Sequence, residues 1–316
     1  MYVYGGNILG GTTVDDLTEI NTASGVCKRM DVAAGVMGTP PSARCSMGFS
    51  AEGRVLYVFG GASESNYLVF MNDLYSYNTS TKSWVELNAA AGVTGSPPSV
   101  RGRVGMTAHD GSLWVTLGYD KPGGVSDDYK KDSHRYNIAT KTWTALGSVS
   151  VGREASSACM IGSSLFVFGG WTNHGGWRDV RDLNRLEVGG TSMAWTMVNS
   201  QGDIPPVCSG AVLTAVGSKL VLFGGTCSLQ VNGFDSDVHV FRPGTDTWTK
   251  ITDTAGQAPT GRVYLGNGAV IGCKIFYFGG CTQGWPCNEQ PSNELFAYEA
   301  APEPGEDECC GNCAVC

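Results

Sequence analysis

Four arginines are the clearest candidates for binding chemistry in the chain, because each lies a similar distance before a glycine that ends an apolar segment. Arg44 and Arg153 lie 16 residues before that glycine, Arg103 lies 15 before it, and Arg262 lies 17 before it. Cys208 takes the corresponding place in one further copy of the pattern. A guanidinium can bind a carboxylate through two parallel hydrogen bonds, so a ring of arginines would suit an acidic peptide. The alternative is that each arginine pairs with a nearby carbonyl or acid and fixes the backbone around it.

Large aromatic residues form a second group, in the stretches that follow the same apolar segments. They are Tyr67, Tyr119, Trp171, Trp177 and Trp285. Arginine and aromatic residues carry more than their share of the binding energy at protein interfaces. We therefore predict a partner-binding surface made of the four arginines and these five aromatic residues. Packing of the aromatic residues against their own scaffold is the alternative.

Groups for catalysis or metal binding do not converge in the sequence. The histidines, His109, His134, His174 and His239, are expected in a turn, two strands and a loop of different repeats. Two or three of them would therefore not form the ligand set that a metal site needs. No phosphate-binding loop or nucleophile elbow is present. We predict no catalytic residue, no metal and no cofactor.

Composition bounds the kind of partner. The 316 residues carry a formal net charge of −8 and contain no block of lysine or arginine. The positive surface that nucleic-acid binding requires is therefore not expected. No apolar run approaches the ~20 residues that span a bilayer. The expected partner is a protein or peptide, and the arginines favour an acidic one.

An apolar segment that ends in two glycines recurs along the chain and divides it into six units. The copies lie at residues 2–6, 56–61, 113–119, 165–170, 220–225 and 275–280. The third copy keeps a single glycine, Gly118, and with it as the first glycine the steps are 55, 58, 51, 55 and 55 residues. A fixed period of this length is typical of a repeat architecture.

Each unit contains short apolar segments that alternate as half-buried strands do. In the second unit, strands are expected at about residues 44–50, 55–59 and 74–77 and from residue 84 onward. The fourth strand begins with a tryptophan in four units, at Trp84, Trp143, Trp195 and Trp248. A small four-stranded sheet cannot bury both faces alone, so the units are expected to stack on one another.

The glycine pair after an apolar strand, the aromatic residue and the spaced tryptophan together resemble kelch repeats, over nearly all of residues 2–298. The resemblance implies an all-β fold, a propeller of six blades with four antiparallel strands each. The units span about residues 1–36, 37–95, 96–148, 149–202, 203–256 and 257–300. The first and last blades are expected to be incomplete in this chain, and an upstream segment of a longer protein would complete both.

The longer connections of such a propeller share one face of the ring, because neighbouring strands are antiparallel. Long loops on a rigid scaffold commonly carry binding residues. We therefore predict a protein–protein interaction module that binds a partner protein or peptide through its long-loop face. Some kelch enzymes that act on sialic acid place arginines near the channel mouth. A carbohydrate-directed enzyme with its site at that mouth is therefore the alternative.

Residues 301–316 form an acidic tail that contains Cys309, Cys310, Cys313 and Cys316. We expect the tail to be disordered or truncated. If it continues into a disulfide-rich module, the protein belongs outside the cell. Without that continuation, a cytoplasmic location is slightly favoured.

Overall fold

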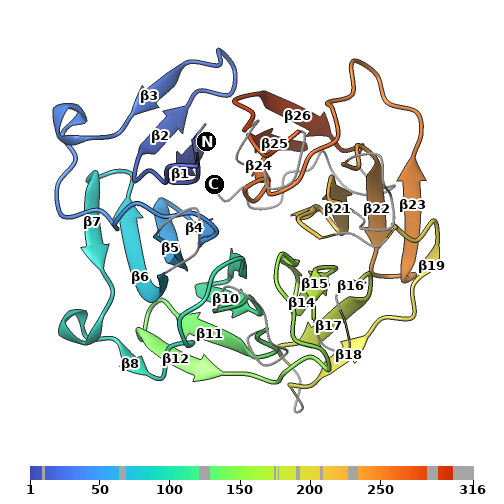
Figure 1. The fold of residues 1–316 in the computed structure, drawn as a ribbon, viewed down its shortest axis with the longest axis horizontal. Helices are drawn as coiled ribbons and strands as arrows, with labels where there is room; N and C mark the ends of the chain where they lie inside the picture. Colours follow the sequence, from blue (N-terminus) through green and yellow to red (C-terminus); the bar gives the residue numbers. More distant parts are fainter. Residues whose placement is uncertain are drawn as a thin grey trace.

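The computed structural model describes residues 1–8, 11–63, 69–120, 129–173, 176, 178–189, 193–206, 209–226, 234–282 and 291–301. These residues form a ring of small antiparallel sheets around a central channel (Figure 1). The fold is an all-β propeller of six blades, which confirms the sequence-based prediction. Residues 302–316 of the predicted tail lie outside the described residues.

The strands of each blade follow one another from the channel to the rim. Blade 1 consists of β1 (Tyr2–Tyr4), β2 (Leu17–Ile20) and β3 (Cys27–Arg29). Blade 2 consists of β4 (Gly48–Glu52), β5 (Val55–Ala62), β6 (Phe70–Asn78) and β7 (Ser83–Glu86). Blade 3 consists of β9 (Gly105–His109), β10 (Ser112–Thr116), β11 (Ser133–Asn137) and β12 (Thr142–Ala145).

The second half of the ring repeats this order. Blade 4 consists of β13 (Ser157–Ile161), β14 (Ser164–Phe168), β17 (Leu183–Glu187) and β18 (Trp195–Met197). Blade 5 consists of β20 (Val212–Val216), β21 (Lys219–Phe223), β22 (Val238–Arg242) and β23 (Thr247–Ile251). Blade 6 consists of β24 (Ala269–Ile271), β25 (Lys274–Phe278) and β26 (Leu295–Glu299). Blades 1 and 6 thus have three strands each within the described part of the chain.

Short elements lie in the connections between these strands. They are β8 (Thr94–Gly95), β19 (Gln201–Gly202), the hairpin of β15 (Trp171–Thr172) and β16 (Arg178–Asp179), and the 3-10 turns η1 (Val32–Ala34) and η2 (Ala89–Ala91). β8 pairs in parallel with β12, and β19 pairs in parallel with β23. A bridge from Met37 to Ser83 has the same geometry. Each linker that enters blade 2, 3 or 5 therefore also clasps the outermost strand of that blade.

The core consists of apolar layers between consecutive blades. Five clusters of buried residues fill the interfaces from blade 1 to blade 6. Trp248 shows the pattern, since its ring lies 5.0 Å from Phe241 in its own blade and 5.4 Å from Phe168 in blade 4. The repeated tryptophan thus joins two sheets, as expected for a large apolar side chain at this position. No described helix is long and apolar enough to cross a membrane.

The third blade differs by one residue from the alignment that its single glycine suggests. Gly60 and Gly61 have φ angles of +61° and +97°, and Leu117 and Gly118 have φ angles of +58° and +101°. Leu117 therefore takes the first-glycine position and Gly118 the second. A non-glycine residue rarely adopts this left-handed conformation, so the glycine pattern alone does not indicate the shift.

Candidate functional site

Four buried arginines hold the start of the inner strands in place. Each has an exposed fraction of 0–1%, and each side chain binds the carbonyl of the first-glycine position and an acid in, or directly before, the third strand. The sets are Arg44 with Gly60 and Asp73, Arg101 with Leu117 and Asp132, Arg153 with Gly169 and Asp182, and Arg262 with Gly279 and Glu294. The guanidinium thus ties together three segments of its own blade.

The backbone of each buried arginine is bound by the preceding blade. The amide of the second-glycine position donates to the arginine carbonyl at 2.8–3.0 Å. The pairs are Gly6 with Arg44, Gly61 with Arg101, Gly118 with Arg153, and Gly225 with Arg262. The four residues, defined here as the anchor arginines, therefore connect neighbouring blades as well as segments within a blade.

Three of the four predicted arginines are anchor arginines: Arg44, Arg153 and Arg262. Their guanidinium groups are covered and paired inside the blade, the arrangement that the sequence offered as the alternative to partner contact. The fourth anchor is Arg101, which sequence reasoning missed, and not Arg103. Arg101 lies 16 residues before Leu117, the same spacing that separates Arg44 from Gly60. Cys208 lies outside the described residues.

Arg103 has a different environment, at the channel mouth. Its Nη1 donates to Oε1 of Glu154 at 2.9 Å, and its side chain is 12% exposed. Its guanidinium carbon lies 5.6 Å from the ring centre of Tyr119 and 5.1 Å from that of Tyr264. Burial raises the pKa of Glu154, although the charge of Arg103 opposes this effect. The site therefore combines a cation between two aromatic rings with a carboxyl group that resists ionisation.

Four aromatic side chains, defined here as the aromatic row, continue from Arg103 across blades 2 to 4. The row consists of Phe70, Tyr119, Tyr129 and Trp171. Consecutive ring centres lie 5.0, 6.1 and 6.3 Å apart. Tyr119 is 8% exposed and Tyr129 is 6% exposed, whereas Phe70 and Trp171 are partly exposed. The predicted residues Tyr119 and Trp171 thus belong to one contact chain.

The residues two positions after the anchor arginines, and after Cys208 in the fifth unit, form a hydrogen-bonded series around the mouth. Ser46, Arg103, Ala155, Gly210 and Tyr264 all have positive φ angles, between +50° and +67°. From Arg103 onward, each amide donates to the carbonyl of the preceding member, at 2.7–3.2 Å. Left-handed backbone at a non-glycine residue costs on the order of 1–3 kcal/mol and is found often at functional sites. The series aims the side chains of Arg103 and Tyr264 at the channel.

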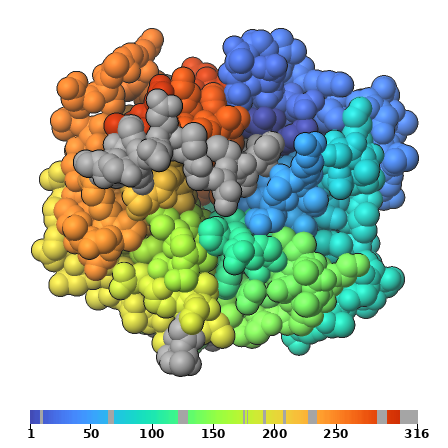
Figure 2. Space-filling view, turned by 180° about the vertical axis from the view of Figure 1, so that it is seen from behind, coloured from blue at the N-terminus to red at the C-terminus, as the bar shows by residue number. Residues whose placement is uncertain are grey.

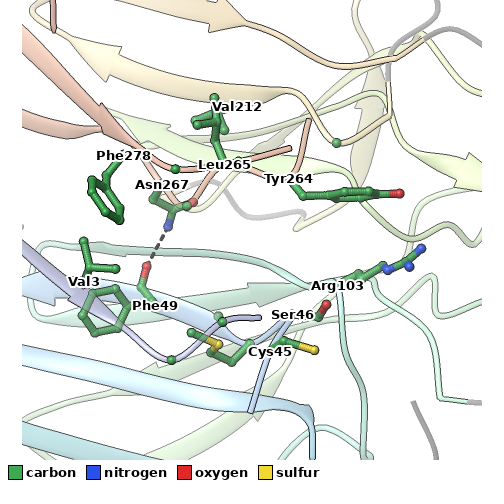
Figure 3. Close-up of a pocket in the computed structure, with 18 of the residues that line it drawn as sticks. Val3, Cys45, Ser46, Phe49, Arg103, Val212, Tyr264, Leu265, Asn267 and Phe278 are labelled. Atoms are coloured by element: carbon green, nitrogen blue, oxygen red, sulfur yellow. Dashed lines mark hydrogen bonds between the residues drawn. The ribbon is translucent and has the colours of Figure 1, made fainter. Parts of the chain in front are cut away.

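A cavity of about 410 Å³ lies beneath this mouth. Arg103 and Tyr264 line one end of it, and Val3, Phe49 and Phe278 line the other (Figure 3). Asn267 reaches into the cavity from blade 6, and its Nδ2 donates to the carbonyls of Phe49 and Met106 at 2.8 Å each.

The remaining predicted residues are placed as follows. Tyr67, Trp177, Trp285 and His174 lie outside the described residues. His109 ends β9, His134 lies in β11 and His239 lies in β22. Burial lowers the pKa of His134 and of His239. No group of three His, Cys, Asp or Glu side chains suited to a metal is found among the described residues.

Comparison with known protein families agrees with this architecture. The model of the KLHDC2/KLHL20/DRC7 Kelch-repeats domain matches residues 1–150 and 145–301. The chain belongs to the kelch-repeat family. The sequence-based resemblance is thereby confirmed.

Several curated proteins are similar to this kelch chain at about one-quarter identity. Kelch domain-containing protein 3 from Rattus norvegicus is 26% identical over 233 residues, and host cell factor 2 from Homo sapiens is 25% identical over 255 residues. Host cell factor 1 from Mus musculus is 26% identical over 251 residues. Each match covers 71% of this chain. The matches cover 58%, 31% and 12% of the three relatives, respectively, so this kelch chain corresponds to only part of each.

Proposed function

We propose that this kelch propeller is a protein-interaction module that binds a partner protein or peptide through its long-loop face. The observation that carries the proposal is the position of Arg103, between Tyr119 and Tyr264 at the channel mouth and next to the aromatic row. Guanidinium and aromatic groups held in fixed positions are typical of interface residues that contribute most of the binding energy. The relatedness to kelch domain-containing protein 3 and the host cell factors also supports an interaction module over a catalyst.

The chemistry of the mouth favours a partner with an acidic group. Glu154 is 1% exposed, and its Oε2 has no hydrogen-bond partner among the described residues. A partner carboxylate that binds Arg103 would raise the pKa of this buried neighbour further, because like charges disfavour joint ionisation. Glu154 would then take up a proton on binding. Affinity for an acidic partner should therefore increase as the pH falls.

The other predicted residues have supporting places in the proposal. The anchor arginines Arg44, Arg153 and Arg262 hold the rim from below and do not touch the partner. Tyr67, Trp177 and Trp285 belong by sequence to the long connections, and we propose that they extend the contact surface beyond the aromatic row.

Affinity capture from the native host with three baits tests the proposal. The first bait is the wild-type protein, and the second carries Arg103→Gln and Trp171→Ala. The third carries Arg54→Ala, an exposed residue in the turn between β4 and β5 on the opposite face. Thermal unfolding checks that all three baits are folded.

We expect a protein that is captured by the first and third baits and lost with the second. Equal capture by all three baits would contradict the use of the loop face. Capture of no protein at all would favour the alternative, a small-molecule site at the channel mouth.

A further inference from the structure

One cysteine of blade 6, Cys273, is part of a disulfide bond. It lies in the short turn that joins β24 to β25, on the face of the ring opposite the channel mouth. The red sixth blade lies between blade 5 and the blue first blade in both views of the ring (Figures 1 and 2). The bonded partner lies outside the described residues, because the other described cysteines are present as thiols. These are Cys27, Cys45, Cys159 and Cys281.

Two of the remaining cysteines, Cys208 and Cys227, belong to the channel mouth. Each is adjacent in sequence to one member of the bridged pair Ser209 and Thr226, at the mouth end of blade 5. The inner strand of this blade, β20, then runs away from the mouth for five residues, which is about 16 Å. A disulfide requires the two Cα atoms to lie within about 7 Å, and one residue extends the chain by only about 3.8 Å. Cys208 and Cys227 are therefore too far from the opposite face.

Cys287 is excluded by the same measure. It lies four residues before Pro291, which bridges to Cys281. Cys281 lies eight residues beyond Cys273 in the direction of β25, about 26 Å at the rise of an extended strand. Four residues span at most about 14 Å, so Cys287 cannot come within disulfide distance of Cys273. The cysteines of the tail remain, namely Cys309, Cys310, Cys313 and Cys316.

The tail begins beside Cys273. Ala300 is 1% exposed, and its amide donates to the carbonyl of Cys273 at 3.0 Å. The carbonyl of Ala301 accepts a hydrogen bond from Nζ of Lys219, at the start of β21 in blade 5. The chain therefore enters the tail on the face that carries the disulfide. Cys309 lies only eight residues after Ala301, so the tail is long enough to return to Cys273.

We propose that Cys273 is bonded to a cysteine of the tail, and that this bond fastens the acidic segment of residues 302–316 to the face of blade 6 opposite the channel mouth. The bond joins positions at least 36 residues apart and encloses β25 and β26. Every residue of β26 is partly or fully exposed. A crosslink restricts the unfolded chain, so a loop of this length should stabilise the blade. The site is separate from the proposed partner surface and independent of it.

The bond is open to thiol chemistry, because Cys273 is partly exposed. Oxidised glutathione can form it in two exchange steps. The Cys273 thiolate attacks oxidised glutathione and releases one glutathione thiolate, and a tail thiolate then attacks the mixed disulfide and releases the second. An excess of a small thiol reverses both steps. The tail is therefore fastened under oxidising conditions and released under reducing ones.

Disulfide mapping of the full chain tests the proposal. The protein is equilibrated with reduced and oxidised glutathione, its remaining thiols are alkylated, and the peptides are identified by mass spectrometry. Trypsin and a glutamate-specific protease together place Cys273, Cys287 and the tail cysteines in separate peptides. The variants are Cys273→Ser and, as the matched control, Cys27→Ser, which removes an exposed thiol. Thermal unfolding with and without dithiothreitol measures the effect of the bond on stability.

We expect a crosslink between the Cys273 peptide and the tail peptide, in the wild-type protein and in Cys27→Ser. Cys273→Ser should lower the unfolding midpoint by roughly 5 °C, given the loop length and the size of the chain. Dithiothreitol should lower the wild-type midpoint by about the same amount more than it lowers that of Cys273→Ser.

Three results would overturn the proposal. The first is Cys273 recovered in its alkylated form after equilibration. The second is a crosslink from Cys273 to Cys208, Cys227 or Cys287. The third is a covalent dimer on a non-reducing gel that Cys273→Ser abolishes, which would place the partner cysteine in a second chain.

Discussion

Replacement of Arg101 by alanine should destabilise the propeller strongly, although the sequence pattern pointed to Arg103. Arg101 has an exposed fraction of 0%. It donates to both oxygens of Asp132 at 2.8 and 2.9 Å and to the carbonyls of Leu117 and Ser99 at 3.1 and 3.0 Å. Burial by itself disfavours ionisation of Asp132, but the hydrogen bonds and charge of Arg101 outweigh it and lower the pKa of that carboxyl group.

The expected loss can be estimated from this geometry. Removing one partner of a buried ion pair costs about 3–5 kcal/mol, and the lower end applies here because the side chain of Asp132 is 36% exposed. An unfolding entropy of about 2.1 cal/mol/K per residue gives roughly 0.6–0.7 kcal/mol/K for a chain of this size. A loss of about 3 kcal/mol should therefore lower the unfolding midpoint by roughly 4–5 °C.

Urea unfolding and thermal unfolding, with tryptophan fluorescence as the signal, measure the change in stability. The matched control is Arg54→Ala, an exposed arginine whose loss should change the free energy of unfolding by less than about 0.5 kcal/mol. The double variant Arg101→Ala with Asp132→Asn should lose less than the sum of the two single variants, because the residues act as a pair. An Arg101→Ala protein as stable as the control would refute the assignment of Arg101 as an anchor.

Gly95→Ala should lower the free energy of unfolding by more than about 2 kcal/mol, because Gly95 has a φ of +76° and an added Cβ would lie 2.2 Å from the Trp143 carbonyl oxygen. Gly53→Ala is the control, since Gly53 also has positive φ but has open space around it. In the same urea titration it should lower the free energy of unfolding by only about 1 kcal/mol. Trp248→Ala should cost about 3–5 kcal/mol because the ring is 1% exposed between two blades, and a loss below about 1 kcal/mol would contradict its role in the core. Burial lowers the pKa of His239, so the contribution of its neutral form to stability is present above about pH 6.5 and is lost as the pH falls through the folded-state pKa. His239→Gln should therefore make the free energy of unfolding fall less steeply on acidification. An unchanged slope would show that His239 does not contribute to the pH dependence.

Much of the architecture was predictable because kelch blades repeat their contacts as well as their composition. The glycine-ended strands and spaced tryptophans predicted six stacked sheets, and the stacking was confirmed. The first unit keeps the same register although it lacks the tryptophan. Ile20 is paired with Cys27 where Tyr77 is paired with Trp84 in blade 2, so cysteine takes the tryptophan position.

The error in blade 3 has a local physical cause. Glycine is the usual residue at positive φ, so the single glycine of this unit predicts the first position of the pair at Gly118 and not at Leu117. The arginine assignment then moved by two residues. A second signal was present in the sequence, because a hydroxyl residue two positions before the anchor also binds its guanidinium. Ser42, Ser99 and Thr260 have this role before Arg44, Arg101 and Arg262.

The candidate site was less predictable, because it depends on contacts between different blades. Tyr264 lies about 160 residues from Arg103 in the sequence, and Glu154 lies 51 residues from it. Neither residue type repeats at its position in the other units. Only the closed ring brings them together, so a repeating pattern predicts three of the four anchors and gives no indication of these two.

The pairing of a linker with the outermost strand of its blade, seen in blades 2, 3 and 5, affects the order of folding during synthesis. Thr94 precedes its partner Thr142 by 48 residues in the chain. Met37 and Gln201 precede their partners Ser83 and Thr247 by a similar number of residues. At a synthesis rate of roughly 5–20 residues per second, the linker residue is made about 2–10 seconds before its partner. When the last strand of a blade emerges, the segment that began that blade is already in position to fix it. The nascent chain should therefore fold one blade at a time, and a pause within a blade should expose unpaired strands for longer than a pause between blades.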